Sequence, residues 1–251
     1  MRVTHCVGFY LPDYLGGTEV YVQDLTVGLT RCSVASEVVA ATDEASPRHY
    51  VWAGAPVSRY PVGWTDAPAE AAASTGAKIT RFQELVLRTR PDVFHLHSWT
   101  SGSGLRQLAQ AAALGIPCVV TIHVPSALCL RGTMLLDGDK VCDGHIEEER
   151  CTRCFAISRG LPAVAASIIA KLPSVPMSPE IQQRLGRVGS MLALRRTVAT
   201  QAANLRYMAE LSTRIVAPSQ WVFDALTCNG VPAHKIVQSQ QAVDESFAAR
   251  G

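Results

Sequence analysis

The first 125 residues alternate between short apolar segments and segments whose apolar residues recur at helical spacing. The strand-like segments are rich in apolar and β-branched residues: 2–10, 36–42, 57–62, 92–98 and 117–123. The helix-like segments carry apolar residues three and four positions apart: 18–29, 77–90 and 104–115. A chain that repeats strand, helix and strand in this way forms a parallel sheet with helices on both faces. We therefore predict an α/β, Rossmann-like, doubly wound parallel sheet.

The alternation lapses in the middle of the chain and then returns. Residues 125–154 resemble a long cysteine-rich loop, and residues 155–213 resemble a helical segment with a break at Gly186 to Gly189. A strand at 214–219, a short helix at 220–230 and a last strand at 235–240 complete the pattern. Since no repeat, low-complexity tract or linker interrupts it, we predict a single domain over residues 1–251.

Charge is distributed unevenly along the chain. The net charge is only +2, which does not favour a nucleic-acid binder. Residues 155–214, however, hold 8 Lys and Arg against 2 Asp and Glu. This basic block is either a solvated helix face or a surface that attracts anionic lipid. Neither a signal peptide nor a membrane-spanning stretch is recognisable, so we expect a cytoplasmic protein, at most peripheral to a membrane.

Unusual residues follow the strand-like segments, where ligands of open parallel sheets bind. Gly16 and Gly17 follow the first strand and begin a helix, so they form either a tight turn or a phosphate site made of backbone N–H groups. His97 and His123 end two further strands, and Ser219 follows a fourth, where it could also be a helix N-cap. His95 lies earlier in its strand, so we expect it to be a packed core residue.

Four cysteines, Cys129, Cys142, Cys151 and Cys154, are spaced C-x12-C-x8-C-x2-C. Four thiolates in one long loop fit a structural zinc site. A redox pair, buried single thiols and disulfides remain alternatives, although disulfides are uncommon in the cytosol.

Five segments together resemble one protein family. The first of them is "LPDYLGGTEVYVQDLTVGL", which starts at Leu11, and the next two are "RPDVFHLHSW" and "PCVVTIHVPSALCLRG". The C-x-x-C pair and "RIVAPSQWVFDALTCNGVPAHKIVQSQQAVD" follow in the same order. These segments resemble the family 4 glycosyltransferases, which have the GT-B fold, and within them a cysteine-bearing subgroup.

The resemblance implies half of a two-domain enzyme. Such enzymes face two Rossmann-like domains across a cleft, the amino-terminal one for the acceptor and the carboxyl-terminal one for the nucleotide-sugar. The sequence ends at Gly251, near where the interdomain linker would begin. We therefore expect the acceptor-binding domain alone, without the donor-binding domain, either as a piece of a longer protein or as a short gene product.

The resemblance also implies roles for single residues. Gly16 and Gly17 would face the donor diphosphate, and His123 would lie beside the transferred sugar. On the acceptor side, His97 would line the pocket, Glu19 would support the glycine loop or cap its helix, and Ser219 would lie near the cleft floor. Val124 replaces the family's usual acidic residue after this histidine, and residues 240–244 depart from the pattern before the linker.

The implied reaction is hexosyl transfer from a UDP- or GDP-sugar to a hydroxyl group, with retention at the anomeric carbon, in glycan, glycolipid or polysaccharide biosynthesis. The acceptor would be a glycan or a lipid-linked molecule, with an anionic membrane surface as a further partner. A non-catalytic acceptor-binding module that docks on a separate donor-binding subunit is the alternative. A metal-dependent hydrolase using His95, His97 and His123 is a third, disfavoured because no carboxylate lies at the same strand ends.

Overall fold

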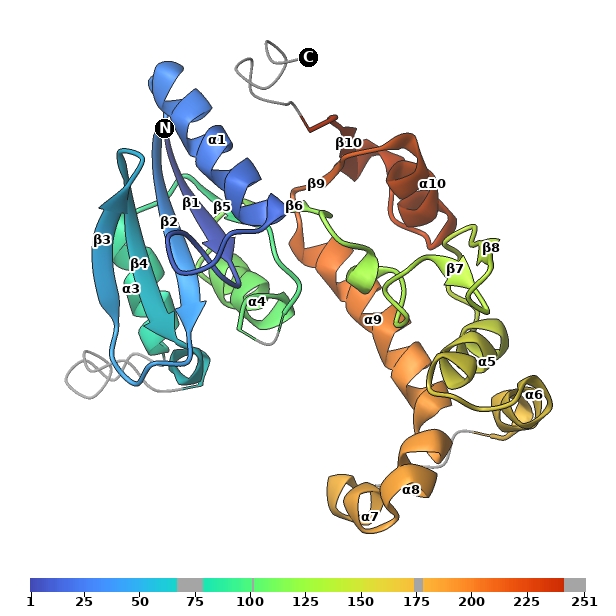
Figure 1. Ribbon diagram of the computed structural model, residues 1–251. Helices are drawn as coiled ribbons and strands as arrows, with labels where there is room; N and C mark the ends of the chain where they lie inside the picture. The colour runs from blue at the N-terminus through green and yellow to red at the C-terminus, as the bar shows by residue number, and fades with distance from the viewer. Residues whose placement is uncertain (67–78, 101, 174–177, 242–251) are drawn as a thin grey trace. The chain divides into compact units, whose positions relative to one another are not determined.

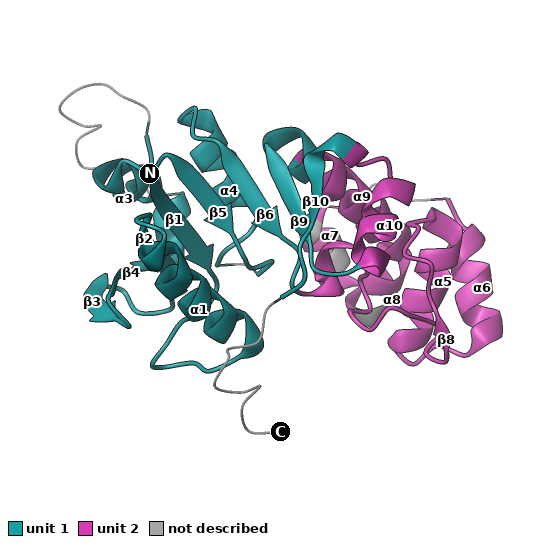
Figure 2. Cartoon of the chain, turned by 90° about the horizontal axis from the view of Figure 1, so that it is seen from above, with its two compact units in different colours: residues 1–123, 208–219, 234–251 teal, residues 124–207, 220–233 magenta. Residues whose placement is uncertain are grey.

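A computed structural model describes residues 1–66, 79–100, 102–173 and 178–241 (Figure 1). The chain divides into two compact units (Figure 2). Unit 1 comprises residues 1–123, 208–219 and 234–251, and unit 2 comprises residues 124–207 and 220–233. The expected cysteine-rich loop, 125–154, and the expected helical segment up to residue 207 thus form a compact unit together with residues 220–233, while residues 208–213 belong to unit 1. The expected helix at 77–90 and the segment 240–244 extend partly outside the described residues.

Unit 1 is built on an eight-stranded sheet in the order β10-β9-β6-β5-β1-β2-β4-β3. Its strands are β1 Arg2–Val7, β2 Ala35–Thr42, β3 Arg48–Trp52, β4 Ala55–Pro61, β5 Val93–Leu96, β6 Cys118–Thr121, β9 Arg214–Ala217 and β10 Ile236–Gln238. All neighbouring strands pair in parallel except β3 and β4. This arrangement confirms the predicted α/β, doubly wound sheet.

Strand β3 is the one strand of this sheet that the sequence pattern did not predict. It joins β4 through Ala53 and Gly54, which have φ values of +47° and +82°. Two successive positive φ values are typical of the tight turn of a hairpin. As an edge strand, β3 has alternate half-buried and exposed residues and no continuous apolar run, so it lacks the signal of a buried strand.

Helices cover both faces of the sheet (Figure 2). On one face lies α1 Gly17–Arg31, whose Val22 packs with Val7 of β1 and Val38 of β2. On the other face lie α3 Arg81–Thr89 and α4 Leu105–Ala113. There Phe82 of α3 contacts Phe94 of β5 edge-on, with ring centroids 6.3 Å apart. The short 3-10 helix η1, Val62–Thr65, follows β4.

The topology fixes where a ligand site can form. After β1 the chain builds β2 and β4 on one side of the sheet, and then returns to place β5, β6, β9 and β10 on the other. The carboxyl ends of β1 and β5 therefore flank the switch point of the sheet. In open α/β sheets this is the crevice where ligands bind.

Unit 2 is mainly helical. It contains α5 Glu148–Ser158, α6 Ala163–Lys171, α7 Pro179–Arg184, α8 Gly186–Leu192, α9 Leu194–Leu211 up to residue 207, and α10 Gln220–Cys228. It also holds the 3-10 helix η2 Pro125–Ala127 and the hairpin of β7 Leu135–Leu136 and β8 Lys140–Val141, while η3 Ala233–Lys235 leads into β10. The break predicted at Gly186 to Gly189 lies just before that stretch, since α7 ends at Arg184 and α8 begins at Gly186 and runs through Gly189.

The expectation of an irregular loop over 125–154 is wrong in part. The hairpin of β7 and β8 occupies its middle, and helix α5 begins at Glu148, so Cys151 and Cys154 lie on a helix. Glu148 and Glu149 lie in the first turn of α5. Their negative charges interact favourably there with the positive end of the helix dipole, which stabilises the start of the helix.

No helix among the described residues has the length and mean hydropathy that a membrane span requires.

Candidate functional site at the sheet edge

The two glycines at the start of α1 differ in which atoms an added Cβ would meet. Neither has a positive φ value, so the backbone conformation does not require glycine at either position. A Cβ on Gly16 would lie 2.5 Å from Oε2 of Glu19. A Cβ on Gly17 would meet no atom within 4 Å. Gly16 thus accommodates the fold, whereas the exposed Gly17 leaves its helical N–H groups open to an approaching ligand.

Glu19 caps the helix that the glycine pair begins. Its carboxylate accepts a hydrogen bond from the backbone N–H of Gly16, and the side chain is buried. Burial raises the pKa of Glu19, while hydrogen bonds from the backbone N–H groups of Glu19 and Gly16 oppose this rise. A carboxylate at the third helical position that bonds back to the N-cap is half of a capping box. Glu19 therefore lies beneath the glycine loop.

His97 and His123 meet beside the same helix. His97 directly follows β5, His123 lies two residues after β6, and His97 Nδ1 is 3.1 Å from His123 Nε2. Tyr21, one turn into α1 from Gly17, packs edge-on against His123 with ring centroids 4.7 Å apart. The start of α1 and the two histidines are therefore neighbours at the switch point.

The expected order of burial in the histidine strand is wrong. His97 is only 2% exposed, whereas His95 is partly accessible. His97 turns inward because both of its ring nitrogens have histidine partners: His123 on one side and His5 on the other, at 3.0 Å. His97 therefore does not line an open pocket. His95 instead bonds Thr121 Oγ1 through Nε2, at 2.8 Å.

The histidines form a hydrogen-bonded chain that runs from the core to the surface. His5 Nδ1 pairs with His97 Nε2, His97 Nδ1 with His123 Nε2, and His123 Nδ1 lies 2.6 Å from the side-chain amide of Gln241. Each link needs one proton and each neutral imidazole carries one N–H, so all three protons must point the same way.

His5, at the buried end of this hydrogen-bonded series of histidines, determines which way the protons point. His5 Nε2 is buried and has no hydrogen-bond partner. An orphaned buried N–H is rarer than an orphaned acceptor, so we expect the His5 proton on Nδ1. His97 and His123 then also carry their protons on Nδ1. His123 presents an N–H donor to the surface, and the amide oxygen of Gln241 accepts it after a half-turn of that amide.

All four histidines are neutral at pH 7. Burial lowers the pKa of His5 and of His123 to about 4. Burial, and secondarily the charges of neighbouring histidines, hold the pKa values of His95 and His97 well below 6.5. A neutral His123 can donate or accept one hydrogen bond, but it does not supply a fixed positive charge.

Ser219 lies at the same edge of the sheet, after β9 and directly before α10, in the N-cap position. It is exposed. Strand β9 neighbours β6, which carries His123, so the predicted Gly17, His123 and Ser219 all follow the carboxyl ends of unit 1 strands or begin the next helix.

Some residues of this site were not predicted from the sequence. Tyr21 and Gln241 carry no motif, and His5 lies inside an apolar strand. His5 could be connected with the site only once the pairing of the strands is known, because it lies in register with His95 on the neighbouring strand. Next to the glycine loop, Phe9 and Tyr14 stack with centroids 4.9 Å apart and are each about half exposed.

Among the described residues, one group of three candidate metal ligands comes within 4.8 Å of one another: His5, His95 and His97. It contains no carboxylate, and both nitrogens of His97 are already engaged in hydrogen bonds. The rings of His95 and His97 lie only 3.8 Å apart between centroids. The cluster thus fits a hydrogen-bonded relay better than a metal centre, which weakens the hydrolase alternative.

The four predicted zinc ligands line one small cavity of about 30 Å³ in unit 2: Cys129, Cys142, Cys151 and Cys154. All are free thiols. Backbone N–H groups donate to two of their sulfur atoms, from Gly144 to Cys142 at 3.5 Å and from Asp137 to Cys154 at 3.2 Å. Within the described chain, however, no three of these sulfurs gather within 4.8 Å. The zinc site therefore stays a prediction.

Comparison with solved structures finds matches of low sequence identity. One is UDP-GlcNAc 2-epimerase from Methanocaldococcus jannaschii, with 12% identity, a TM-score of 0.43, and coverage of 95% of this chain and 45% of that one. Another is Anabaena Alr3699/HepE in complex with UDP and glucose, with 12% identity, a TM-score of 0.47, and coverage of 98% of this chain and 46% of that one. A third is the catalytic domain of Starch Synthase IV from Arabidopsis thaliana bound to ADP and acarbose. It has 14% identity, a TM-score of 0.43, and coverage of 98% of this chain and 52% of that one.

The chain thus spans about half the length of the solved structures that it matches. Comparison with curated protein sequences gives no significant match.

The family model of the glycosyl transferase 4-like domain matches residues 16–238, from the first glycine of the pair to the last strand of the sheet. This match covers most of the chain and includes every residue that the sequence analysis placed at the sheet edge. The chain therefore belongs to the glycosyl transferase 4-like domain family.

Proposed function

We propose that this domain is the acceptor-side half of a retaining hexosyltransferase that uses a UDP- or GDP-sugar in glycan, glycolipid or polysaccharide biosynthesis. The observation that carries the proposal is the space beyond Gly17, which is exposed and unoccupied by any side chain at the start of α1. Backbone N–H groups and the positive end of a helix dipole favour an anion such as a diphosphate at such a position.

In this proposal the residues of the sheet edge divide their roles between the two substrates. Gly16 and Gly17 let the donor diphosphate approach the helix, and His123 donates a hydrogen bond to the transferred sugar. His97 and Glu19 position His123 and the glycine loop, respectively. Ser219, with the stacked Phe9 and Tyr14, faces the acceptor, since aromatic rings pack well against the apolar faces of sugar rings.

The chemistry needs a partner domain of the same protein. A leaving diphosphate develops negative charge, which helix termini and basic side chains stabilise without a metal ion. Unit 1 offers the terminus of α1, and the two arginines beside the described glycine loop, Arg48 and Arg59, are paired with Asp13. We place the cationic groups and the paired carboxylates on a carboxyl-terminal donor domain. The isolated chain would accordingly show little or no transfer.

The test is sugar transfer by the natural gene product, with its acceptor sought among glycans and lipid-linked sugars. We expect His123→Asn to lower turnover by about 100-fold or more, because one oxyanion-type donor is commonly worth that much. His49→Asn, at an exposed position of β3, should leave turnover unchanged. Equal turnover of both variants would contradict the role of His123.

A further inference from the structure

Unit 2 presents two rows of exposed aliphatic side chains on consecutive helices. On α6 and its end, Val164, Ile168 and Leu172 are spaced four residues apart and are 75%, 59% and 41% exposed. On α7 and α8 the second row follows with spacings of four and three residues: Ile181, Leu185 and Val188. Such spacing places the first row along one side of α6, whereas the second row crosses the break between α7 and α8. We call the two rows the aliphatic face.

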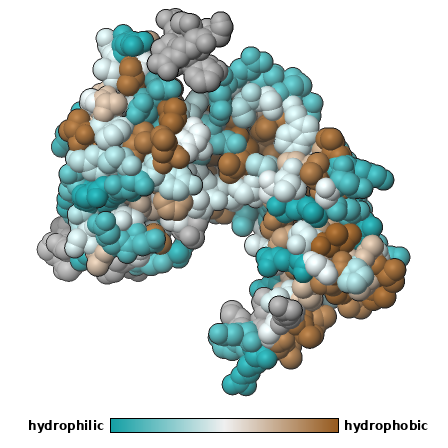
Figure 3. Space-filling model, viewed as in Figure 1, coloured by the Kyte–Doolittle hydropathy of each residue, from teal (hydrophilic) through white to brown (hydrophobic). Residues whose placement is uncertain are grey.

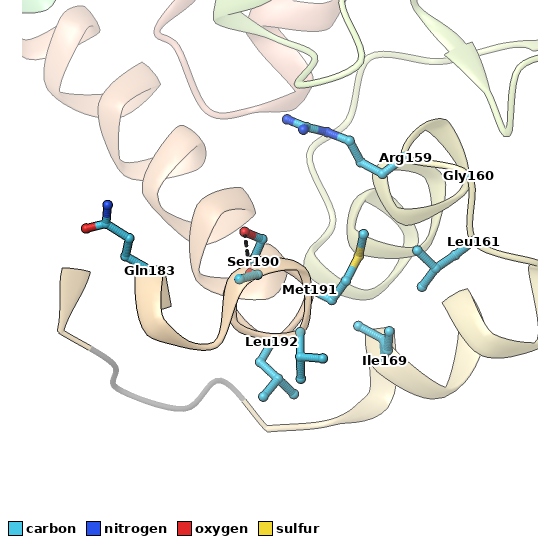
Figure 4. A pocket seen from close by; sticks show the side chains of 10 residues that line it. Arg159, Gly160, Leu161, Ile169, Gln183, Ser190, Met191 and Leu192 are labelled. Atoms are coloured by element: carbon cyan, nitrogen blue, oxygen red, sulfur yellow. Dashed lines mark hydrogen bonds between the residues drawn. The ribbon is translucent and has the colours of Figure 1, made fainter. Parts of the chain in front are cut away.

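An open pocket of about 1170 Å³ lies between the helices that carry these rows. Leu161 and Ile169 line it from α6 and its approach, and Val188, Met191 and Leu192 line it from α8 (Figure 4). In the space-filling view, apolar residues gather over this part of unit 2 (Figure 3). The apolar surface is therefore continuous with a hollow, and no described side chain fills that hollow.

The charges around the aliphatic face have one dominant sign. Arg159 lines the pocket and is exposed, and Lys171 and Arg184 are exposed at the ends of α6 and α7. Between Arg150 and Ala209 the sequence contains a single acidic residue, Glu180. Glu148 also lies near Leu172, where it is paired with Arg195. Aliphatic side chains with exposed cations and few acids around them match the two layers of an anionic bilayer surface, which has hydrocarbon beneath negative head groups.

We propose that unit 2 docks on an anionic lipid bilayer through the aliphatic face, with the aliphatic side chains inserted among the acyl chains and Arg159, Lys171 and Arg184 at the phosphate level. This goes beyond the basic helix block of the sequence by assigning the insertion to α6, α7 and α8. It gives the proposed lipid-linked acceptor a membrane beside the domain, but its own basis is the surface of unit 2.

A protein partner is the competing occupant of such a face. A second copy of this chain would bring the same cations against Arg159 and Lys171, which is repulsive wherever like charges come opposite one another. A bilayer supplies mobile anions that arrange themselves around the cations, so the charge pattern favours lipid.

The test measures flotation of the purified chain with vesicles. Phosphatidylcholine vesicles that contain about one third phosphatidylglycerol should bind the chain, and pure phosphatidylcholine should bind it far more weakly. The variant with Val164→Asp and Ile168→Asp should partition at least about tenfold more weakly into the anionic vesicles, because it loses apolar contact and gains two negative charges.

A matched control separates insertion from bulk charge. Val51→Asp with Val141→Asp makes the same charge change at positions 68% and 82% exposed, and it should weaken binding by less than about twofold. Circular dichroism melting verifies that both variants fold. Unchanged binding of the α6 variant, an equal loss in the control, or a dimer that the α6 variant dissociates in the absence of lipid would overturn the proposal. Since no readout involves sugar transfer, the outcome leaves the proposed reaction to its own test.

Discussion

At the scale of single residues, the glycines at positions 16 and 17 differ in their surroundings. A Cβ on Gly16 would lie 2.5 Å from Oε2 of Glu19, so the end of that side chain would have to move. Gly17 is helical, has no positive φ and faces open space, so the fold gives it no reason to be glycine. The sequence predicted the pair as a unit at the end of the first strand. The difference between its members depends on where the Glu19 side chain lies, which no local pattern contains.

Gly17→Ala should leave the free energy of unfolding unchanged or raise it by up to about 1 kcal/mol, because alanine restricts the unfolded chain and fits a helix. The same variant should lower sugar transfer by about tenfold or more, since a methyl group would occupy the space kept for the ligand. Gly28→Ala, also within α1 and with open space beyond its Cβ, is the matched control. It should share the effect on stability and retain full transfer. Denaturant unfolding and turnover measure both, and equal transfer by the two variants would count against the role of Gly17.

The histidine chain should be visible by nitrogen-15 NMR at pH 7. We expect His5, His97 and His123 to be neutral with the proton on Nδ1, because His5 Nε2 has no partner. Protons on Nε2 in these three rings would show that the chain runs in the opposite direction.

Unit 1 should begin to lose stability at a higher pH than a domain without buried neutral histidines. A pKa lowered to about 4 in His5 means that the unfolded chain, with a pKa near 6.5, binds the proton more tightly. Stability is therefore complete above pH 6.5 and falls as the pH decreases toward 4, by about 2 kcal/mol for His5 alone at pH 5. Urea unfolding between pH 7.5 and 5 measures the loss. His123→Gln should reduce it and the exposed His145→Gln should not; equal losses in the two variants would refute the assignment.

At the scale of elements, the end of α10 holds the cysteine-bearing segment in place. Asn229 accepts a hydrogen bond from the backbone N–H of Ile146 at 2.8 Å, and its amide donates to the carbonyls of Gly144 and Ala225, both at 2.7 Å. Gly144 has a φ of +82°, and a Cβ there would lie 2.5 Å from Ala225. The sequence predicted a helix end at Asn229 and Gly230, but not that Asn229 bridges to residues 83 and 85 positions earlier.

Asn229→Ala should therefore lower the free energy of unfolding of unit 2 by about 1–3 kcal/mol, because a half-buried donor and carbonyls lose their partner. Thr227→Ala, on the exposed side of the same helix, removes only a bond to Phe223 and should cost less than about 0.5 kcal/mol. Denaturant unfolding gives both values. A loss in Asn229→Ala no greater than that in Thr227→Ala would contradict this account of the segment.

The secondary structure around Cys151 and Cys154 differs from the loop that the C-x-x-C motif predicted. The C-x-x-C pair lies in the first two turns of α5, so its sulfurs are held by a helix and not by a loop. Elemental analysis of protein purified without chelator tests the zinc prediction. We expect about one zinc per chain, and chelation should then lower the melting temperature because metal binding is coupled to folding. Fewer than about 0.2 equivalents would reject zinc at these cysteines.

At the scale of the whole molecule, the parallel sheet could be predicted because most of its strands are short segments rich in apolar and β-branched residues that alternate with helical patterns. What could not be predicted depends on contacts between distant residues. The edge strand β3 has no such pattern, and the compact unit 2 joins residues 124–207 to 220–233. In the candidate site, Gly17, His123 and Ser219 could be placed at one sheet edge from the sequence, because the ends of parallel strands collect there. Tyr21, Gln241 and the partnership of His5 with His97 arise only when the sheet and α1 are packed together.

The central claim, that this chain is the acceptor side of a nucleotide-sugar-dependent transferase, is tested most directly by the release of nucleotide. UDP- and GDP-hexoses are incubated with the natural gene product, and with the isolated chain of residues 1–251, over a panel of glycan and lipid-linked acceptors. We expect acceptor-dependent release of UDP or GDP, with an anomerically retained product, by a protein that includes a donor domain. We expect at least about 100-fold less release by the isolated chain. Comparable turnover by the isolated chain, or none from any nucleotide-sugar when a donor domain is present, would contradict this claim.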